Sequence, residues 1–221
     1  FKSKDKFSCP ICKYHGPFMD KNNRLRAKCP KCGELERARL ARLVLDKIYD
    51  DKKASETDVL HISPENSLRK FFKKRFKSYI SSDLYRKDVD HQFDIEEIPY
   101  PNKSFDLVFA SHVLEYVRND KKAIREIQRV LRPGGLAFLP VPMLHEKTID
   151  FEERPLNKRI IRETGIDYFD RYREVFDDVE VYEPSSFDKQ FNLTIDMLDN
   201  LDSHSEKSFY LLPNLLPVCK A

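Results

Sequence analysis

Short apolar runs alternate with helical patterns from Val59 onward, and this alternation limits the possible folds more than any other feature of the sequence. The runs are rich in valine, isoleucine, leucine and phenylalanine, as expected for strands buried on both faces. Strands that alternate with helices form a parallel sheet with right-handed crossovers. The predicted strands are Val59–Ile62, Tyr79–Asp83, Phe105–Ser111, Leu136–Val141, Val179–Tyr182 and Ser208–Leu212. The sequence therefore predicts an α/β domain with a mostly parallel sheet, which the last two strands finish as a hairpin.

The segments between these strands carry apolar residues at helical spacing along one face. The predicted helices are Glu34–Tyr49, Asn66–Phe76, Asp120–Leu131 and Asp167–Phe176. Arg132–Gly135 contains the Pro-Gly-Gly sequence that should end the third helix. Asp50–Thr57 is polar and predicts a linker, and Pro142–Thr164 predicts a loop or lid over the sheet edge.

Four of the five cysteines form two Cys-x-x-Cys pairs separated by 16 residues. Each pair can present two thiolates to one ion, and four sulfur ligands make the tetrahedral site that zinc prefers. A redox-active pair or a disulfide explains this spacing less well. With every position filled by sulfur, no position is open for a substrate, so the expected zinc is structural. The predicted metal ligands are Cys9, Cys12, Cys29 and Cys32.

The sequence suggests three parts: a zinc ribbon over residues 1–33, a connecting helix and linker over 34–57, and a main domain over 58–221. A ribbon this short should depend on its metal to fold. No apolar run approaches the roughly 18 residues that cross a bilayer, and the first residues lack the apolar core of a signal peptide. Clustered cysteines suit a reducing compartment. We therefore expect a cytoplasmic protein without a membrane span, and an oligomer remains open.

The net charge of +3 is unevenly distributed along the chain. Residues 1–55 carry 15 Lys and Arg against 7 Asp and Glu, whereas residues 151–221 carry 9 against 15. A basic front end is compatible with an anionic partner such as a nucleic acid, which Arg37, Arg39 and Arg42 could contact. A solvated basic surface is the simpler interpretation.

Only five glycines occur, which excludes a P-loop and a G-x-G-x-x-G dinucleotide fingerprint. Both motifs bring the backbone close to phosphates, so a cofactor without phosphates does not need them. A strand that feeds a helix N-terminus is nevertheless where α/β proteins bind ligands. Val59–Glu65 has this character, and we expect Ser63 to cap the next helix and Pro64 to lie in its first turn.

Four blocks of the sequence resemble class I S-adenosylmethionine-dependent methyltransferases of the type-11 group. These blocks are Val59–Glu65, Asp83, Phe105–Val117 and Leu131–Leu136. The two cysteine pairs followed by Leu-His-x-x-Pro-Glu resemble, more closely, a bacterial subgroup with an N-terminal zinc ribbon that is often associated with glycan or small-metabolite modification. The resemblance covers residues 9–143 well and 165–183 loosely. It implies a Rossmann-like fold with a mostly parallel seven-stranded sheet, a methyltransferase domain over residues 58–221, and S-adenosylmethionine as cofactor.

The resemblance also implies roles for individual residues. Asp83 ends a strand where a carboxylate can accept both ribose hydroxyls, although a loop acid is an alternative. Ser63 and the following N–H groups can hold the methionyl carboxylate. Glu65 can pair with the methionyl ammonium or complement the helix dipole, and Asp94 can accept from the adenine amine or serve as a turn residue. The expected cofactor-binding residues are His61, Ser63, Pro64, Glu65, Asp83, Leu84, Asp94, Ile95, Ser111 and His112.

Methyl transfer is an in-line displacement at a sulfonium methyl, so the protein mainly positions the acceptor and removes its proton where the acceptor is a hydroxyl. His112 follows Ser111 at the end of a strand and is the first candidate base, although a role in shaping the cofactor site is equally open. His145 is the second candidate. Tyr168 and Arg171 are candidates for acceptor contact, with core packing or an ion pair as the alternative.

Three functions are compatible with these patterns. The first is a methyltransferase of a small-molecule or sugar (glycan-precursor) acceptor. The second is an RNA methyltransferase, which the basic front end favours, although the ribbon lacks interleaved aromatic residues and the chain lacks an Asn-Pro-Pro-Tyr-type motif for a base amine. The third is a degenerate, non-catalytic binding protein, which the missing glycines favour and the retained Asp83 and Ser111–His112 oppose.

Overall fold

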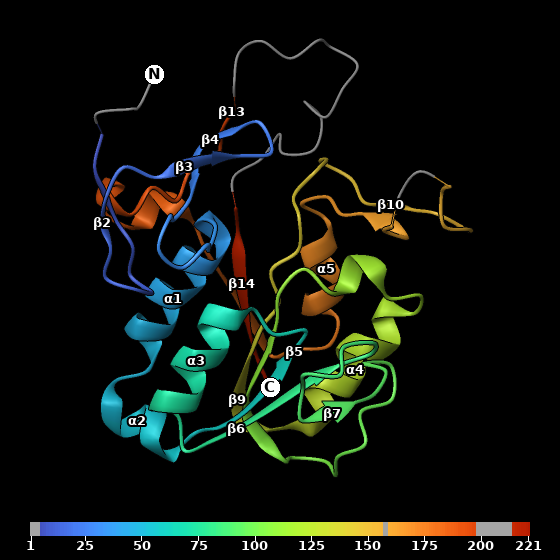
Figure 1. Ribbon diagram of the computed structural model, residues 1–221. Helices are drawn as coiled ribbons and strands as arrows, with labels where there is room; N and C mark the ends of the chain where they lie inside the picture. Colours follow the sequence, from blue (N-terminus) through green and yellow to red (C-terminus); the bar gives the residue numbers. More distant parts are fainter. Residues whose placement is uncertain (1–4, 157–158, 198–213) are drawn as a thin grey trace.

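The computed structural model describes residues 5–156, 159–197 and 214–221, and shows a central sheet with helices on both faces (Figure 1). Among these residues the sheet has seven strands in the order β12-β14-β9-β8-β5-β6-β7. Five of them, from β9 to β7, are parallel, and β14 runs antiparallel to both β9 and β12. The strands are β5 (Asp58–Ile62), β6 (Ser78–Asp83), β7 (His91–Gln92), β8 (Phe105–Ala110), β9 (Leu131–Phe138), β12 (Asp178–Tyr182) and β14 (Leu216–Lys220). The predicted Rossmann-like fold with a mostly parallel seven-stranded sheet is confirmed.

Two layers of helices bury the two faces of this sheet. The helices are α1 (Glu36–Ile48), α2 (Asp51–Glu56), α3 (Asn66–Arg75), α4 (Asp120–Val130) and α5 (Tyr168–Arg173). Helices α1, α2 and α3 share one apolar core with alternate strand residues such as Val59 and Phe109, whereas α4 and α5 share the other with Leu60 and Val108. Figure 1 shows the first group on the left of the sheet and the second on the right. Side chains on both faces of β5 and β8 are buried, which explains their uninterrupted apolar sequences.

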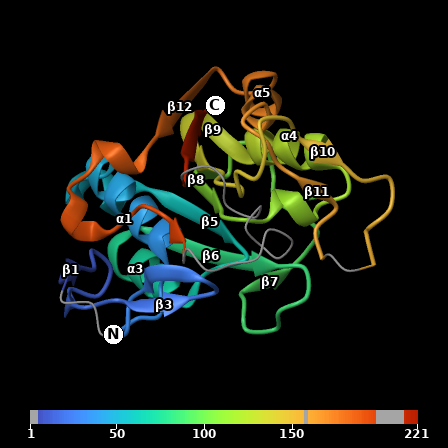
Figure 2. The ribbon, with the colours of Figure 1, turned by 90° about the horizontal axis from the view of Figure 1, so that it is seen from above.

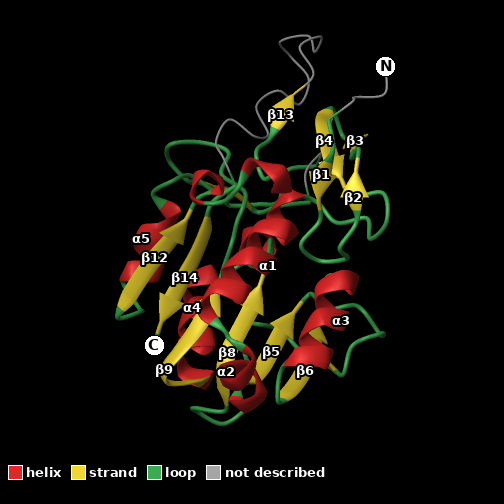
Figure 3. Ribbon diagram, turned by 90° about the vertical axis from the view of Figure 1, so that its left-hand side faces the viewer, coloured by secondary structure: helices red, strands yellow, loops and turns green. Residues whose placement is uncertain are grey.

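The N-terminal segment forms two small antiparallel sheets. Strands β1 (Phe7–Ser8) and β2 (His15–Gly16) make one, and β3 (Met19–Lys21) pairs with β4 (Arg24–Lys28) in the other. A strand from the far end of the chain, β13 (Asp196–Met197), adds to β4. These strands lie beyond the arrowheads of β5, β6 and β8 (Figure 3), at the end of the sheet where α/β proteins place ligands. The division of the chain at residue 33 stays a prediction, but the small sheet is completed by a strand of the main domain.

Two sequence predictions about local structure are wrong. Asp50–Thr57 is not a polar linker, because the Asp50 carboxylate accepts from the Lys53 N–H (2.7 Å) and caps α2, whose Ala54 is buried. Strand β9 begins at Leu131 instead of Leu136 and ends at Phe138, because the Pro-Gly-Gly sequence is incorporated into the strand after α4 ends.

The last strand also differs from the prediction. Residues 208–212 lie outside the described part of the chain, and the final strand is β14, over Leu216–Lys220. Pro217 lies within this strand, although proline cannot donate a hydrogen bond to a neighbouring strand. It is accommodated because its carbonyl still accepts from the Leu139 N–H (3.2 Å). Strands β12 and β14 pair antiparallel, but β13 lies between them in the sequence, and the predicted partner strand over 208–212 lies outside the described residues.

The described part of the connection after β9 is a loop, as predicted, in which two strands of two residues each, β10 (Ile149–Asp150) and β11 (Arg162–Glu163), form a small antiparallel hairpin. Three short 3₁₀ helices complete the described chain: η1 (Leu114–Tyr116), η2 (Pro184–Ser186) and η3 (Lys189–Phe191). In the parts of the chain that the structure describes, no helix combines the length and the apolarity needed to cross a bilayer. The cytoplasmic location and any oligomeric state stay predictions.

Candidate functional site

The carboxyl ends of β5, β6 and β8 meet at one edge of the sheet, and the loops after β5 and β8 have unusual backbones. Ser63, just after β5, has φ of +51°, and His112, just after β8, has φ of +54°. This left-handed conformation is rare for residues with a side chain and often marks functional loops. Hydrogen bonds hold both turns, since Ser63 donates its N–H to Ser82 (2.7 Å) and His112 to Pro140 (2.8 Å).

The start of α3 differs from the sequence prediction. Ser63 does not cap this helix and Pro64 does not lie in its first turn, because the left-handed turn at Ser63 delays the helix until Asn66. Glu65 occupies the N-cap position but makes no capping bond with its side chain. Pro64 is buried ahead of the helix, and its carbonyl accepts from the Arg86 guanidinium (2.7 Å).

The N–H groups in the first turn of α3 were expected to be free for the methionyl carboxylate. One of them is already used, because the Ser67 N–H donates to the Glu34 carboxylate (3.3 Å). The Ser67 hydroxyl donates to the carbonyl of Cys32 (3.3 Å). Seen from above (Figure 2), the N-terminal strands β1 and β3 lie on the side of the sheet that α1 and α3 cover. The N-terminal segment therefore caps α3 from outside the main domain.

A buried relay fixes the orientation of Glu65. His61 has no exposed surface, and its Nε2 lies 3.2 Å from a Glu65 carboxylate oxygen, while its Nδ1 lies 3.1 Å from the Tyr79 hydroxyl. Burial lowers the pKa of His61 and raises the pKa of Tyr79. Burial is the largest single influence and opposes the charge on Glu65, but the hydrogen bond from His61, a backbone N–H and the Arg37 charge act together against it and lower the pKa of Glu65. Tyr79 therefore donates to a neutral His61, which donates to an ionised Glu65.

Asp83 ends β6 beside the turn at Ser63. One carboxylate oxygen accepts from the N–H groups of Tyr85 (2.8 Å) and Arg86 (3.0 Å), and the nearby Ser63 hydroxyl also favours the ionised carboxylate. Burial opposes the charge, but these hydrogen bonds and the Arg86 guanidinium outweigh it and lower the pKa of Asp83. The structure thus brings Ser63 and an ionised Asp83 together at the carboxyl ends of neighbouring strands.

The remaining residues expected at the cofactor are spread along the same edge. Ile95 is buried against the core beside Ile62, whereas Leu84 is 45% exposed. Asp94 is exposed, and its carboxylate accepts from the Glu96 N–H (2.9 Å), which is the turn role considered as its alternative. Ser111 is buried at the end of β8, next to His112.

Each candidate catalytic histidine lies beside a glutamate that sequence reasoning missed. His112 Nδ1 is 3.5 Å from a carboxylate oxygen of Glu115, which is 1% exposed. Among the described residues, no group hydrogen-bonds to the other oxygen of Glu115. His145 Nε2 is 2.8 Å from the carboxylate of Glu163. The three-residue spacing from His112 to Glu115 was a usable signal, whereas nothing in the sequence connected His145 with Glu163.

Tyr168 and Arg171 take their alternative, structural roles. The Tyr168 hydroxyl donates to Asp120 (2.7 Å) and is fully buried, and Arg171 bridges Asp120 and Asp150. Arg162 joins the same network through Asp120 and Asp150 and donates to the carbonyls of Leu114 and Val117. The network fixes η1, which carries Glu115, against the hairpin that carries Glu163.

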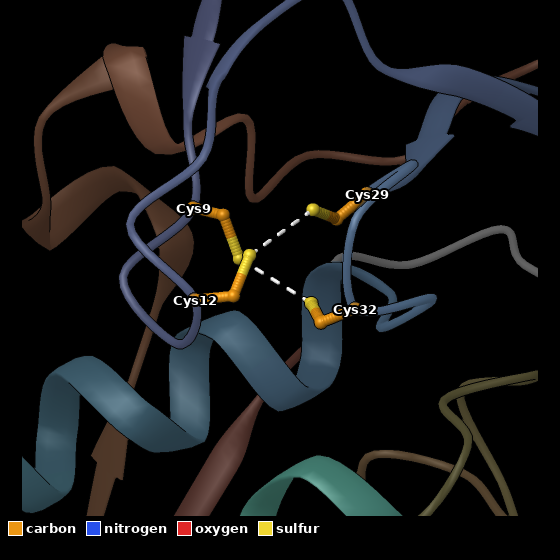
Figure 4. Close-up of side chains that lie close together, drawn as sticks. All are labelled: Cys9, Cys12, Cys29 and Cys32. Carbon is orange, nitrogen blue, oxygen red and sulfur yellow. Dashed lines mark hydrogen bonds between the residues drawn. The ribbon is translucent and has the colours of Figure 1, made fainter.

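The four predicted cysteine ligands converge, as Figure 4 shows. All four sulfur atoms lie within 4.8 Å of one another, and the closest pairs, Cys9–Cys32 and Cys12–Cys29, are 3.7 and 3.6 Å apart. A tetrahedron with zinc–sulfur bonds of about 2.3 Å has edges of about 3.8 Å. None of the four is in a disulfide. The donor set therefore fits zinc closely, with no ligand position open.

The two cysteine knuckles have the same backbone pattern. In each, the residue after the second cysteine has a positive φ (Lys13, +60°; Gly33, +79°). This residue donates its N–H to the carbonyl of the first cysteine, Cys9 (3.0 Å) or Cys29 (2.9 Å). Glycine suits such a turn, as the sequence indicated at Gly33.

The front-end arginines mostly hold the chain together. Arg39 was a candidate contact for an anionic partner, but its guanidinium is fully buried under the ribbon. Arg24 forms a buried ion pair with Glu36 (2.5 Å), and Arg42 bonds to Asp46 (2.9 Å) and covers the Phe71 ring. The excess of basic residues in this segment therefore overstates the charge available to a partner.

Comparison with known proteins agrees with this geometry. Residues 50–139 match a family model described as a methyltransferase domain. The chain is 37% identical over 95 residues to 27-O-demethylrifamycin SV methyltransferase of Amycolatopsis mediterranei, and 34% identical over 87 residues to malonyl-[acyl-carrier protein] O-methyltransferase of Enterobacter lignolyticus. The two matches cover 38% and 36% of this chain. The chain spans about a third of the length of these curated relatives, 35% in both cases.

The fold is shared with solved structures. A S-adenosylmethionine-dependent methyltransferase from Mesorhizobium loti aligns with a TM-score of 0.56 at 16% identity, over 82% of this chain and 98% of that one. At this identity the likeness extends to the fold alone.

Proposed function

We propose that this chain is an S-adenosylmethionine-dependent methyltransferase that acts on a small-molecule or sugar (glycan-precursor) acceptor by direct in-line transfer. The match of residues 50–139 to the methyltransferase domain model supports this proposal. One observation carries the proposal. Two ionised carboxylates, Glu65 and Asp83, lie after neighbouring parallel strands at the edge where α/β folds bind ligands. Such a pair suits a cofactor that has a cationic amino-acid end and a ribose.

The residues present fit that cofactor without phosphate-binding glycines. Asp83 would accept from the ribose hydroxyls, and Glu65, held by His61, would receive the methionyl ammonium. Buried Ile95 offers an apolar wall for the adenine ring. When bound, S-adenosylmethionine supplies an electrophilic methyl group. We further propose that the cysteine cluster holds a structural zinc ion, since its four sulfur atoms leave no position for a substrate.

The acceptor side would use His112 and His145. Each has a carboxylate beside its ring, Glu115 or Glu163, that can orient the imidazole and stabilise a proton taken from a hydroxyl. Methyl transfer to a hydroxyl needs such a proton acceptor, whereas transfer to a neutral amine does not. The names of the two curated relatives given above describe a small or a carrier-bound acceptor, and both specify oxygen as the methylated atom.

The alternatives receive less support. An RNA acceptor would need free positive charge near the site, but of the three candidate arginines Arg39 is buried and Arg42 pairs with Asp46, which leaves only Arg37 partly exposed. A degenerate, non-catalytic domain would have no reason to keep ionised Glu65 and Asp83 in place.

Calorimetry with S-adenosylmethionine and S-adenosylhomocysteine tests the proposal. We expect binding in about the micromolar range typical of cofactor sites, and at least about a tenfold loss, or about 1.4 kcal/mol, in Asp83→Ala. Asp170→Ala is the matched control, because Asp170 is exposed on α5 and pairs with Arg173. Absence of heat with the wild-type protein at high ligand concentration would rule out the proposed function.

A screen with methyl-labelled cofactor tests the acceptor class. We expect label in hydroxyl-bearing small molecules or sugars and a large loss of rate in His112→Gln, with His15→Gln in the ribbon as control. If RNA were the acceptor, its binding would weaken steeply with salt. Labelled RNA with that salt response would replace the small-acceptor proposal.

A further inference from the structure

The second cysteine knuckle contacts the helix that carries Glu65. Ser67, in the first turn of α3, donates its hydroxyl to the carbonyl of Cys32 and its N–H to the carboxylate of Glu34. Both partners belong to the knuckle that starts at Cys29. The first turn of α3 is thus attached to the ribbon through side-chain and backbone groups of one residue.

Helix α3 has no comparable cap of its own. Its N-cap residue, Glu65, makes no capping bond because its carboxylate is turned to His61. The preceding turn is strained, since Ser63 has a left-handed backbone without being glycine. An uncapped helix start after a strained turn would fray readily. Glu34 supplies the missing bond from another part of the chain.

The knuckle in turn fixes Glu34. The Cys29 N–H donates to the carbonyl of Glu34 (3.0 Å), and the guanidinium of Arg39 donates to the same carbonyl (3.2 Å). Glu34 lies two residues after Cys32, so its backbone is ordered by the same turn that presents the thiolates. Loss of the metal removes the main restraint on such a knuckle and would release the Glu34 carboxylate from α3.

We propose that Glu34 and Ser67 are positioning residues of the cofactor site, and that zinc and cofactor therefore bind with positive coupling. The knuckle holds the first turn of α3 so that Glu65 stays where the cofactor's ammonium meets it. A glycine-rich loop shapes a ligand site with its own backbone, whereas in this chain contacts from the ribbon hold the start of α3 in place. The inference rests on the proposed function, because it assigns Glu65 to the cofactor.

Variants on the contact test the first half of this proposal. We expect Glu34→Ala to weaken S-adenosylhomocysteine binding in calorimetry by about 5-fold or more, the lower end of typical coupling between sites. Glu34→Gln keeps an acceptor oxygen for the Ser67 N–H and should largely restore affinity, and Ser67→Ala should give an intermediate loss. Ser8→Ala is the matched control, because the Ser8 hydroxyl contacts only the exposed His15 ring of the first hairpin among its described hydrogen bonds.

Zinc competition tests the second half without any measurement of activity. Zinc affinity is measured by competition with a chelating dye, in the presence and absence of saturating S-adenosylhomocysteine. Because coupling is reciprocal, the ligand should raise zinc affinity by the factor by which zinc raises ligand affinity. Glu34→Ala should abolish this increase while still binding zinc.

The outcomes separate the inference from the function beneath it. Wild-type protein that binds the ligand, with Glu34→Ala and Ser67→Ala equally tight and zinc affinity unchanged, keeps the function and overturns the coupling. Wild-type protein that binds no ligand overturns both.

Discussion

Replacement of Arg39 with methionine tests how the ribbon is attached to the main domain. Its guanidinium has no exposed surface, lies 4.6 Å from the Phe18 ring, and has a pKa lowered mainly by burial. It donates to four backbone carbonyls, those of Ala27, Glu34, Phe191 and Asn192, at 2.5 to 3.2 Å. Methionine preserves much of the stem volume but donates nothing, so ribbon strand β4 and segment η3 would lose their shared donor.

The magnitude follows from two opposing terms. Four charged hydrogen bonds at about 1.5–3 kcal/mol each would total roughly 6–12 kcal/mol. The variant also removes a buried charge whose desolvation was itself costly, and the four bonds are not independent. We therefore expect the free energy of unfolding to fall by about 3–5 kcal/mol, because up to four buried carbonyls would lose their donor at about 1–3 kcal/mol each while the desolvation cost of the charge is recovered.

Urea unfolding of the zinc-loaded protein, followed by circular dichroism, measures this loss. Arg125→Met is the control, because Arg125 is exposed on α4 and should change stability by less than about 0.5 kcal/mol. A loss below about 1 kcal/mol in Arg39→Met would refute the reasoning, since it would mean that the four carbonyls find other partners at little cost.

Four further predictions concern the edge of the sheet and the cysteine cluster. Tyr79→Phe removes the hydroxyl that donates to His61 and should lower the free energy of urea unfolding by about 1 kcal/mol, whereas exposed Tyr85→Phe should not. The pKa of His61 is lowered in the fold, so its neutral form contributes to stability. This contribution is complete above about pH 6.5 and declines as the pH falls further. In His61→Gln this part of the curve of stability against pH should flatten. The lowered pKa values of Glu65 and Asp83 give a second loss below about pH 4, which Asp83→Asn should diminish. Cys29→Ser should reduce zinc, measured with a chelating dye at about one ion per chain, to a small fraction of that value.

The sequence alone predicts those elements whose formation depends on residues adjacent in the chain. Strands β5 and β8 are continuous apolar runs, and the two cysteine pairs have a spacing that few other sites share. It was insufficient where distant parts of the chain decide. Two-residue strand β13 exists because β4 offers it an edge, and β14 forms despite Pro217 because it fills the space between β9 and β12. No local pattern contains that information.

The same distinction applies to the site. The acids at Glu65 and Asp83 could be located from their positions after predicted strands, but their partners could not. Arg39 has the sequence pattern of a surface arginine on an amphipathic helix. Two of the carbonyls that accept its hydrogen bonds nevertheless belong to residues more than 150 positions away. Charge counting along the chain therefore included arginines that the fold uses for internal contacts.

The missing glycine at the turn after β5 connects these findings. A left-handed backbone at a residue with a side chain costs of order 1–3 kcal/mol, and glycine at Ser63 would avoid most of it. Glycine, however, would remove the hydroxyl that helps to keep Asp83 ionised. It would also leave the start of α3 no less dependent on Glu34, because the uncapped helix start lies beyond the turn. The strain at Ser63 is therefore offset by bonds to β6 on one side and to the ribbon on the other. A chain that shapes its ligand loop with side chains needs such supports from distant segments, and in this protein the supporting segment is itself ordered by four cysteines.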